Sequence, residues 1–152
     1  MSQNLIQTLN DLLVNELTAS NRCLAHAELC DEHGYGRLLE AHERRAQEEM
    51  AHARALIGRL ISLRARPQPA RPDPVAVDVD IARQIRGDLQ ASEATVAGYH
   101  QGIQLAVEAG DQGTRELLEN ILREEQEQLS WLQSQANQVE RLGLQGYLRQ
   151  QA

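Results

Sequence analysis

The sequence has few aromatic residues: they make up 3% of its 152 residues, and phenylalanine is absent. Leucine, isoleucine, valine and alanine must therefore fill the core, a composition that favours packed helices over a β-sandwich. The net charge of -7 argues against a nucleic-acid-binding protein, which would carry a basic patch or tail. The sequence has neither a signal-peptide pattern nor an apolar run that approaches a membrane span. We therefore expect a cytoplasmic protein with no nucleic-acid or membrane partner.

Cysteine is also scarce. Cys23 and Cys30 are seven residues apart on one expected helix, which separates them by roughly 10 Å along the helix axis. That separation is too large for a disulfide bond between them. We expect both to be reduced and to be buried as small hydrophobic side chains.

Four stretches of the chain repeat apolar residues every three or four positions, which is typical of amphipathic helices. The first stretch ends at the turn formed by residues 33–36, and the second runs from about Arg37 to Leu63. The third ends near Gly110 and the fourth at Gly143, because glycine is a common stop signal for helices. Residues 144–151 predict a short fifth helix.

All four prolines lie in the segment from Arg66 to Pro74. Proline disrupts a helix interior, so this segment predicts an extended crossover. Two helical hairpins joined by one long crossover predict an all-α fold, a four-helix bundle with ferritin-like topology. The length fits one domain with a substantial core, which we expect to cover residues 1–152.

Ionisable residues interrupt the apolar stripes of three helices. Glu49 and His52 are three residues apart and so face the same side of a helix. A Glu-x-x-His pair that faces a bundle interior is half of a carboxylate-bridged metal centre. Glu16 falls within the apolar stripe of the first helix, and Glu125 within that of the fourth. The sequence therefore predicts a metal site formed by Glu16, Glu49, His52 and Glu125.

The pattern of a two-metal centre is incomplete on the last two helices. Ser92 stands where the third helix should provide a glutamate, and Gln128 stands three residues after Glu125, where a histidine is required. Hard divalent ions prefer carboxylate and imidazole ligands, whereas serine is short and neutral and glutamine offers only an amide oxygen. We expect one metal ion at most to bind well, and oxidation of two irons by O₂ to be slow or absent. Restoring Ser92→Glu together with Gln128→His is then expected to raise oxidation.

The chain resembles the bacterioferritin family from end to end. The matching stretches are residues 12–17, the Glu-Met-Ala-His motif at 49–52, residues 121–125, Trp131-Leu132 and residues 143–148. The resemblance implies an iron-storage shell of 24 subunits, with haem b held at a twofold interface by the same methionine of each subunit. Met50 stands at the position of that methionine. Leu17, Asn21 and Leu24 match the surrounding haem pocket, whereas Ser20, Glu43 and Gln47 are more polar than is usual there.

The resemblance also implies partners. The family can combine one subunit type that carries the ferroxidase site with another that supplies the haem methionine, and this chain is similar to the second type. We expect it to rely on a ferroxidase-competent partner subunit, in a shell that is either homomeric or mixed. A ferredoxin-type electron donor for iron release is a further expected partner. No residue of this chain is assigned a catalytic role.

Two alternative functions remain open. One is an active ferroxidase that oxidises Fe(II) with O₂ at an altered site, and the other is a structural ferritin-like protein without a metal. We expect the remaining histidines to be surface or interface residues and not ligands: His26, His33, His42 and His100. Apart from Glu125, the acidic run at residues 124–127 predicts a surface that faces solvent or the shell cavity. Among the other departures from the family, Arg44 replaces a histidine and Arg45 an acidic residue.

Overall fold

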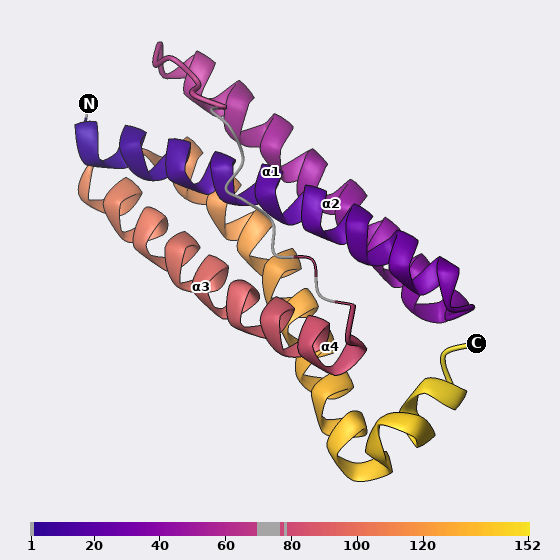
Figure 1. The fold of residues 1–152 in the computed structure, drawn as a ribbon. Helices are drawn as coiled ribbons and strands as arrows, with labels where there is room; N and C mark the ends of the chain where they lie inside the picture. The colour runs from indigo at the N-terminus through magenta and orange to yellow at the C-terminus, as the bar shows by residue number, and fades with distance from the viewer. Residues whose placement is uncertain (1, 70–76, 78) are drawn as a thin grey trace.

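Four long helices form the bundle in a computed structural model of the chain, which describes residues 2–69, 77 and 79–152. Helix α1 spans Gln3–Glu32, α2 spans Gly36–Ser62, α3 spans Ile81–Glu108 and α4 spans Gln112–Arg149. The pair α1 and α2 forms one antiparallel hairpin, the pair α3 and α4 forms the other, and the hairpins pack against each other (Figure 1). The predicted all-α four-helix bundle is confirmed.

Polar caps and glycines set the helix ends. The side chains of Ser2, Asp80 and Asp111 each accept a hydrogen bond from a backbone N–H in the first turn of α1, α3 and α4, which satisfies a donor that has no partner within the helix. After α1 and α3 the chain turns at Gly34 and Gly110, whose φ angles are 77° and 66°. Glycine adopts this left-handed conformation without a steric penalty, so both hairpin turns are short.

The crossover begins against α1. Residues 66–69 are not helical, as predicted, whereas the rest of the predicted crossover, residues 70–74, lies outside the described residues. Asn10 holds this first part: its Oδ1 accepts a hydrogen bond from Gln68 N at 2.7 Å, and its Nδ2 donates to Arg66 O at 3.4 Å. The buried amide therefore ties the exit from α2 to the first helix.

Gly143 bends α4 near its end. Its φ of 72° and ψ of 158° are not helical, and the chain turns sharply there (Figure 1). Beyond the bend the chain folds back, so that Gln151 O accepts a hydrogen bond from Arg37 N at 2.9 Å. The predicted stop is present as a kink, but the predicted fifth helix is not a separate element. Helical structure resumes directly after the one glycine, and residues 144–149 form the end of α4.

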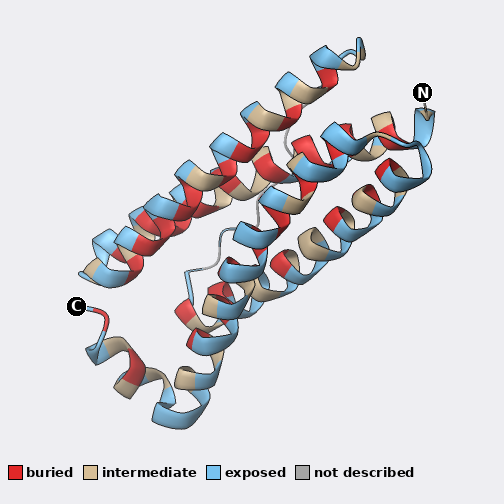
Figure 2. Ribbon diagram, turned by 180° about the vertical axis from the view of Figure 1, so that it is seen from behind, coloured by how far each residue is buried: buried red, intermediate tan, exposed pale blue. Residues whose placement is uncertain are grey.

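Buried residues follow the inward-facing stripe of each helix (Figure 2). Leucines dominate the main core, among them the fully buried Leu9, Leu13 and Leu56. Cys23 and Cys30 are free and fully buried, as predicted. Across the described part of the chain, no helix has the length and apolar character that a membrane span requires.

Candidate metal centre

The bundle interior brings together the four predicted metal ligands. Glu16 comes from α1, Glu49 and His52 from α2, and Glu125 from α4, and all four are buried. One potential ligand atom from each lies within 4.8 Å of the others. Three carboxylates and one imidazole in this arrangement are suited to a first-row divalent ion such as Fe²⁺.

His52 contacts three carboxylates. Its Nδ1 lies 3.1 Å from Glu125 Oε1 and 3.4 Å from Glu16 Oε2, and its Nε2 lies 2.6 Å from Glu124 Oε2. The other carboxylate oxygen of Glu16, Oε1, accepts a hydrogen bond from the hydroxyl of Tyr99 on α3 at 2.5 Å. Two residues of the site were therefore not predicted: Tyr99, and Glu124, which is largely exposed but contacts His52 all the same.

Protons can balance the negative charge of this cluster. Burial, reinforced by the hydrogen bond with Glu16, raises the pKa of Glu49 well above its usual value. The pKa of Glu16 is lowered although burial opposes this, because Glu49, His52 and Tyr99 all hydrogen-bond to it. Burial also disfavours a charged His52, but Glu125 and Glu16 raise its pKa to about 11, while burial raises the pKa of Glu125 to about 7. A bound cation would take the place of these protons.

The other half of the expected two-metal centre is built differently. Ser92 is buried, and no described residue forms a hydrogen bond with its Oγ. The amide of Gln128 is engaged at both ends: its Nε2 donates to Glu48 Oε2 at 2.8 Å, and its Oε1 accepts from Arg45 Nε at 3.5 Å. Neither Ser92 nor Gln128 supplies the negative charge or the imidazole that a second metal ion would need.

Asp88 organises a second buried cluster one helical turn before Ser92. Its carboxylate lies 3.1 Å from Arg22 Nε, 3.5 Å from Arg45 Nη1 and 3.4 Å from His26 Nδ1. Burial works to raise its pKa, but His26 and the two arginines lower it to about 2. His26, His42 and Asp88 lie close together, and each of the three has a side chain of a type that can bind a metal ion. Two arginines already neutralise the only carboxylate of that group, so it is a poor site for a cation.

The expectation for the histidines is half wrong. His33 and His100 are exposed, but His26 and His42 are buried, with exposed fractions of 1% and 4%. Their rings meet edge to face with centroids 5.6 Å apart. Burial lowers the pKa of His42 to about 4. The charge of Asp88 on α3 opposes this lowering and gives the two rings a polar neighbour inside the bundle.

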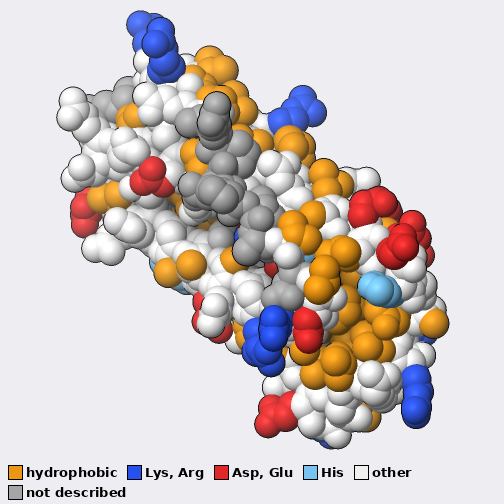
Figure 3. All heavy atoms as spheres, in the orientation of Figure 1, with side chains coloured by type: hydrophobic (Ala, Val, Ile, Leu, Met, Phe, Trp, Pro, Cys, Tyr) orange, Lys and Arg blue, Asp and Glu red, His pale blue; other side chains and the backbone are white. Residues whose placement is uncertain are grey.

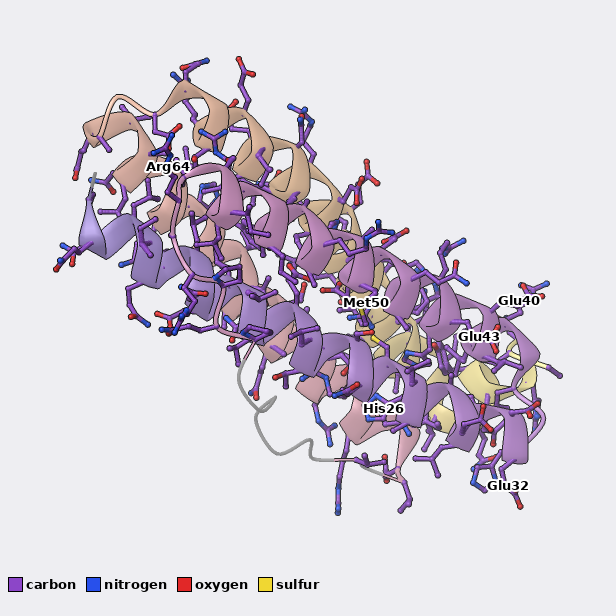
Figure 4. The ribbon with its side chains drawn as sticks, turned by 90° about the horizontal axis from the view of Figure 1, so that it is seen from above. His26, Glu32, Glu40, Glu43, Met50 and Arg64 are labelled. Atoms are coloured by element: carbon purple, nitrogen blue, oxygen red, sulfur yellow. The ribbon has the colours of Figure 1, made fainter. Side chains whose placement is uncertain are left out.

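Met50 lies on another face of α2. It is 44% exposed, whereas its neighbour Glu49 is buried, and Figure 4 labels it together with Glu43 on the same helix. Met50 and Leu24, itself 52% exposed, are part of a shallow surface pocket between α1 and α2. The pocket is lined by Ser20, Leu24, Glu43, Ala46, Gln47 and Met50.

The remaining predicted haem-pocket residues lie on α1. Leu17 is half-buried and Asn21 is exposed, and neither lines the pocket. Ser20 adds less polarity than the sequence suggests, because its hydroxyl donates to Ala46 O at 3.2 Å. Figure 3 shows that hydrophobic side chains gather over part of one face of the bundle and are not evenly spread. Gathered surface hydrophobic residues are typical of interaction sites.

Comparisons with known proteins match nearly the whole chain. A family model described as a ferritin-like domain matches residues 6–142. The chain is similar to a bacterial ferritin of Neisseria meningitidis, with 30% identity over 151 residues, which cover 99% of this chain and 97% of the relative. A bacterial ferritin of Pseudomonas aeruginosa is 30% identical over 147 residues, 96% of this chain and 95% of the relative. A bacterioferritin of Brucella melitensis is 28% identical over 142 residues, 93% and 88% of the two chains.

Proposed function

Because the chain belongs to the ferritin family, we propose that it is a bacterioferritin-type subunit of an iron-storage shell of 24 subunits. The observation that carries the proposal is the unequal division of the buried site. Glu16, Glu49, His52 and Glu125 keep the ligand chemistry of iron within one cluster, while Ser92 and Gln128 do not. Iron is the stored cargo in this proposal, and the chain is a single-domain building block.

The four-residue cluster binds one divalent ion in this proposal. The raised pKa values of Glu49 and His52 favour protons that offset the charge of the carboxylates, so one cation can replace these protons without leaving a buried charge uncompensated. A ferroxidase-competent partner subunit in a mixed shell then carries out the two-iron reaction with O₂. Stored iron is released by electrons from a ferredoxin-type donor.

Met50 is the residue that would hold haem b at a twofold interface in this proposal. The residues present fit this group: the thioether is exposed at a surface pocket beside Leu24, and the Ser20 hydroxyl is occupied by a backbone carbonyl. Leu17 and Asn21 do not line this pocket, and their part in the proposal rests on the family resemblance, while a second copy of the chain would supply the second methionine. When bound, haem supplies a redox group, and methionine ligation raises the potential of such a group.

The division of labour is tested by iron oxidation. Fe(II) is added to shells of this chain alone, and O₂ consumption and Fe(III) absorbance are followed against a buffer blank. We expect the rate to stay close to that of the blank, and to rise when a ferroxidase-competent subunit is assembled into the same shell. Rapid oxidation by this chain alone would contradict the proposal and favour the altered-site ferroxidase, for which Glu124 beside His52 provides an additional carboxylate.

Haem binding is tested by absorption spectroscopy on shells purified from the cells that make the protein. We expect a Soret band that is lost in Met50→Leu and retained in Ile61→Leu, a matched change at another exposed apolar residue of α2. Native mass spectrometry of the same material reports subunit composition and haem content. Particles without haem and metal, or chains that do not assemble, would favour a structural protein instead.

A further inference from the structure

Arg45 lies in the second half of the candidate site. It comes from α2, one turn before Glu49, and only 5% of its surface is exposed. Its Nε donates to Gln128 Oε1 at 3.5 Å and its Nη1 to Asp88 Oδ2 at 3.5 Å. Because Asp88 lies one helical turn before Ser92 on α3, the guanidinium lies close to both positions where ligands of a second metal ion are missing.

The guanidinium brings a permanent positive charge into the bundle. It is not deprotonated in proteins. Burial opposes the charge, but Cys23, Asp88, Glu49 and Glu125 together raise the pKa of Arg45 above its usual value. The family resemblance assigns Glu49 and Glu125 as the carboxylates that bridge two metal ions. Arg45 therefore uses negative charge that a second metal ion would require.

Gln128 is committed to the same arrangement. Its oxygen is the only atom of its side chain that could coordinate a metal, and this oxygen accepts the hydrogen bond from Arg45. Its nitrogen donates to Glu48 at 2.8 Å, which fixes the orientation of the amide. The hydrogen bonds from Asp88 through Arg45 and Gln128 to Glu48 thus form one continuous row, from α3 to α2, on to α4 and back to α2.

We propose that the Arg45 guanidinium takes the place of the second metal ion and limits the site to a single ion. The inference rests on the proposed function, because it takes the cluster of Glu16 and its three partners as the site of that single ion. Metal ions in two-metal centres lie about 4 Å apart, so a second ion would be held beside the guanidinium and repelled by it. Restoring Ser92→Glu and Gln128→His alone is then not sufficient to rebuild a two-metal centre.

Co²⁺ titration of shells assembled from the full chain tests this inference. Metal content is measured by mass spectrometry after gel filtration, and coordination by visible absorption. We expect the double variant Ser92→Glu/Gln128→His to bind as much Co²⁺ per chain as the wild type. Adding Arg45→Gln to the double variant should raise the content by about one ion per chain. Adding Arg22→Gln instead is the matched control, because Arg22 also contacts Asp88, at 3.1 Å, but not Gln128.

The outcomes separate the two proposals. A second ion in the double variant with Arg45 intact would overturn the inference, as would equal gains from the Arg45 and Arg22 changes or no gain from either. A wild-type chain without Co²⁺ would overturn the single-metal site of the proposed function. In that case the role of Arg45 would still be decided by the difference in Co²⁺ content between the double and triple variants, because both carry Ser92→Glu and Gln128→His.

A single substitution keeps the test valid if the triple variant does not fold. Arg45→Met in the otherwise unchanged chain removes a positive charge close to the four-residue cluster. We expect it to tighten Co²⁺ binding at the first position about tenfold, because the variant lacks a fixed positive charge that repels the bound cation, while the stoichiometry stays the same. Arg22→Met should leave the affinity unchanged. Equal affinities in Arg45→Met and the wild type would contradict the inference.

Discussion

The two halves of the buried site balance charge in opposite ways. Around Glu16, Glu49, His52 and Glu125 the positive charge is mobile, because it consists of protons that a cation can displace. Around Asp88 and Gln128 the positive charge is fixed, because Arg22 and Arg45 supply it through their side chains. Without these two arginines the buried carboxylate of Asp88 would be uncompensated, which is costly. In the second half, the guanidinium of Arg45 therefore supplies the positive charge that a metal ion would otherwise bring.

The largest expected effect comes from removing a ligand in the half with mobile charge. His52→Gln replaces the imidazole that lies within 3.4 Å of both Glu16 and Glu125. We expect Co²⁺ or Zn²⁺ affinity to fall by at least about 100-fold, more than the loss of a group around the metal ligands causes. Isothermal titration calorimetry at constant pH measures the change.

The matched change in the half with fixed charge is Ser92→Ala. Its hydroxyl is buried and lacks a hydrogen-bond partner among the described residues, so its removal leaves no polar group unsatisfied. We expect metal affinity to stay within a factor of about two and the unfolding free energy to be equal or higher, because no hydrogen bond is lost and an unpaired buried hydroxyl is removed. A large loss of metal affinity in Ser92→Ala would show that the serine is a ligand and that the halves are not distinct.

The next effect concerns stability in acid. Burial lowers the pKa of His42 to about 4 in the folded chain, whereas a solvent-exposed histidine has a pKa of 6.5. Between these values the unfolded chain binds a proton at residue 42 that the folded chain does not, so stability falls as the pH drops from 6.5 to 4 and is unaffected above 6.5. At about 1.4 kcal/mol per pKa unit, the ceiling is about 3 kcal/mol. Asp88, which faces His42, stays ionised throughout this window because its pKa is about 2.

Urea unfolding at pH 7 and pH 4.5, with metal removed and subunit concentration fixed, measures this difference. We expect His42→Asn to lose less stability than the wild type on acidification. The exposed His100 provides the matched control, because His100→Asn should follow the wild type. Parallel losses in the wild type and His42→Asn would mean that His42 is protonated in the folded chain.

The sequence predicts the half with mobile charge better than the half with fixed charge, for a physical reason. Glu49 and His52 belong together because three residues make nearly one helical turn, and Glu16 and Glu125 are recognisable as charges within apolar stripes. These signals are local. The roles of Arg45 and His42 depend on Asp88, which is more than forty residues away in the chain, and a long arginine side chain shows its direction only once the helices are packed.

Tyr99 was missed for the same reason as Arg45. It stands seven residues after Ser92, two helical turns along the same face of α3, but an aromatic residue in an apolar stripe is usually part of the core. Only the structure shows that its hydroxyl reaches Glu16. The fold was more accessible, because the four prolines and the glycines at 34, 110 and 143 mark the breaks directly. The backbone leaves the helical conformation at Gly143, as predicted, but residues 144–149 continue as the end of α4 and are not shown as a separate fifth helix.

The smallest expected loss of stability separates a hydroxyl that supports the metal site from one that supports only the fold. Tyr99 and Tyr147 are both fully buried, and each donates to a side-chain oxygen, Tyr99 to Glu16 and Tyr147 to Gln135. Tyr99→Phe and Tyr147→Phe should each cost about 1 kcal/mol of unfolding free energy, the usual net value of one hydrogen bond. Only Tyr99→Phe should also weaken metal binding, by about tenfold.

The distinction follows from what each acceptor does. The Tyr99 hydroxyl helps to lower the pKa of Glu16 and orients a carboxylate that contacts His52. Gln135, by contrast, accepts its hydrogen bond from Tyr147, which lies outside the four-residue cluster. Metal titration and urea unfolding of both variants measure affinity and stability separately. Equal affinities in the two variants would place Tyr99 in the core alone and remove α3 from the half with mobile charge. A selective loss in Tyr99→Phe would show that α3 still supports this half through a hydrogen bond, although it no longer provides a ligand for the other.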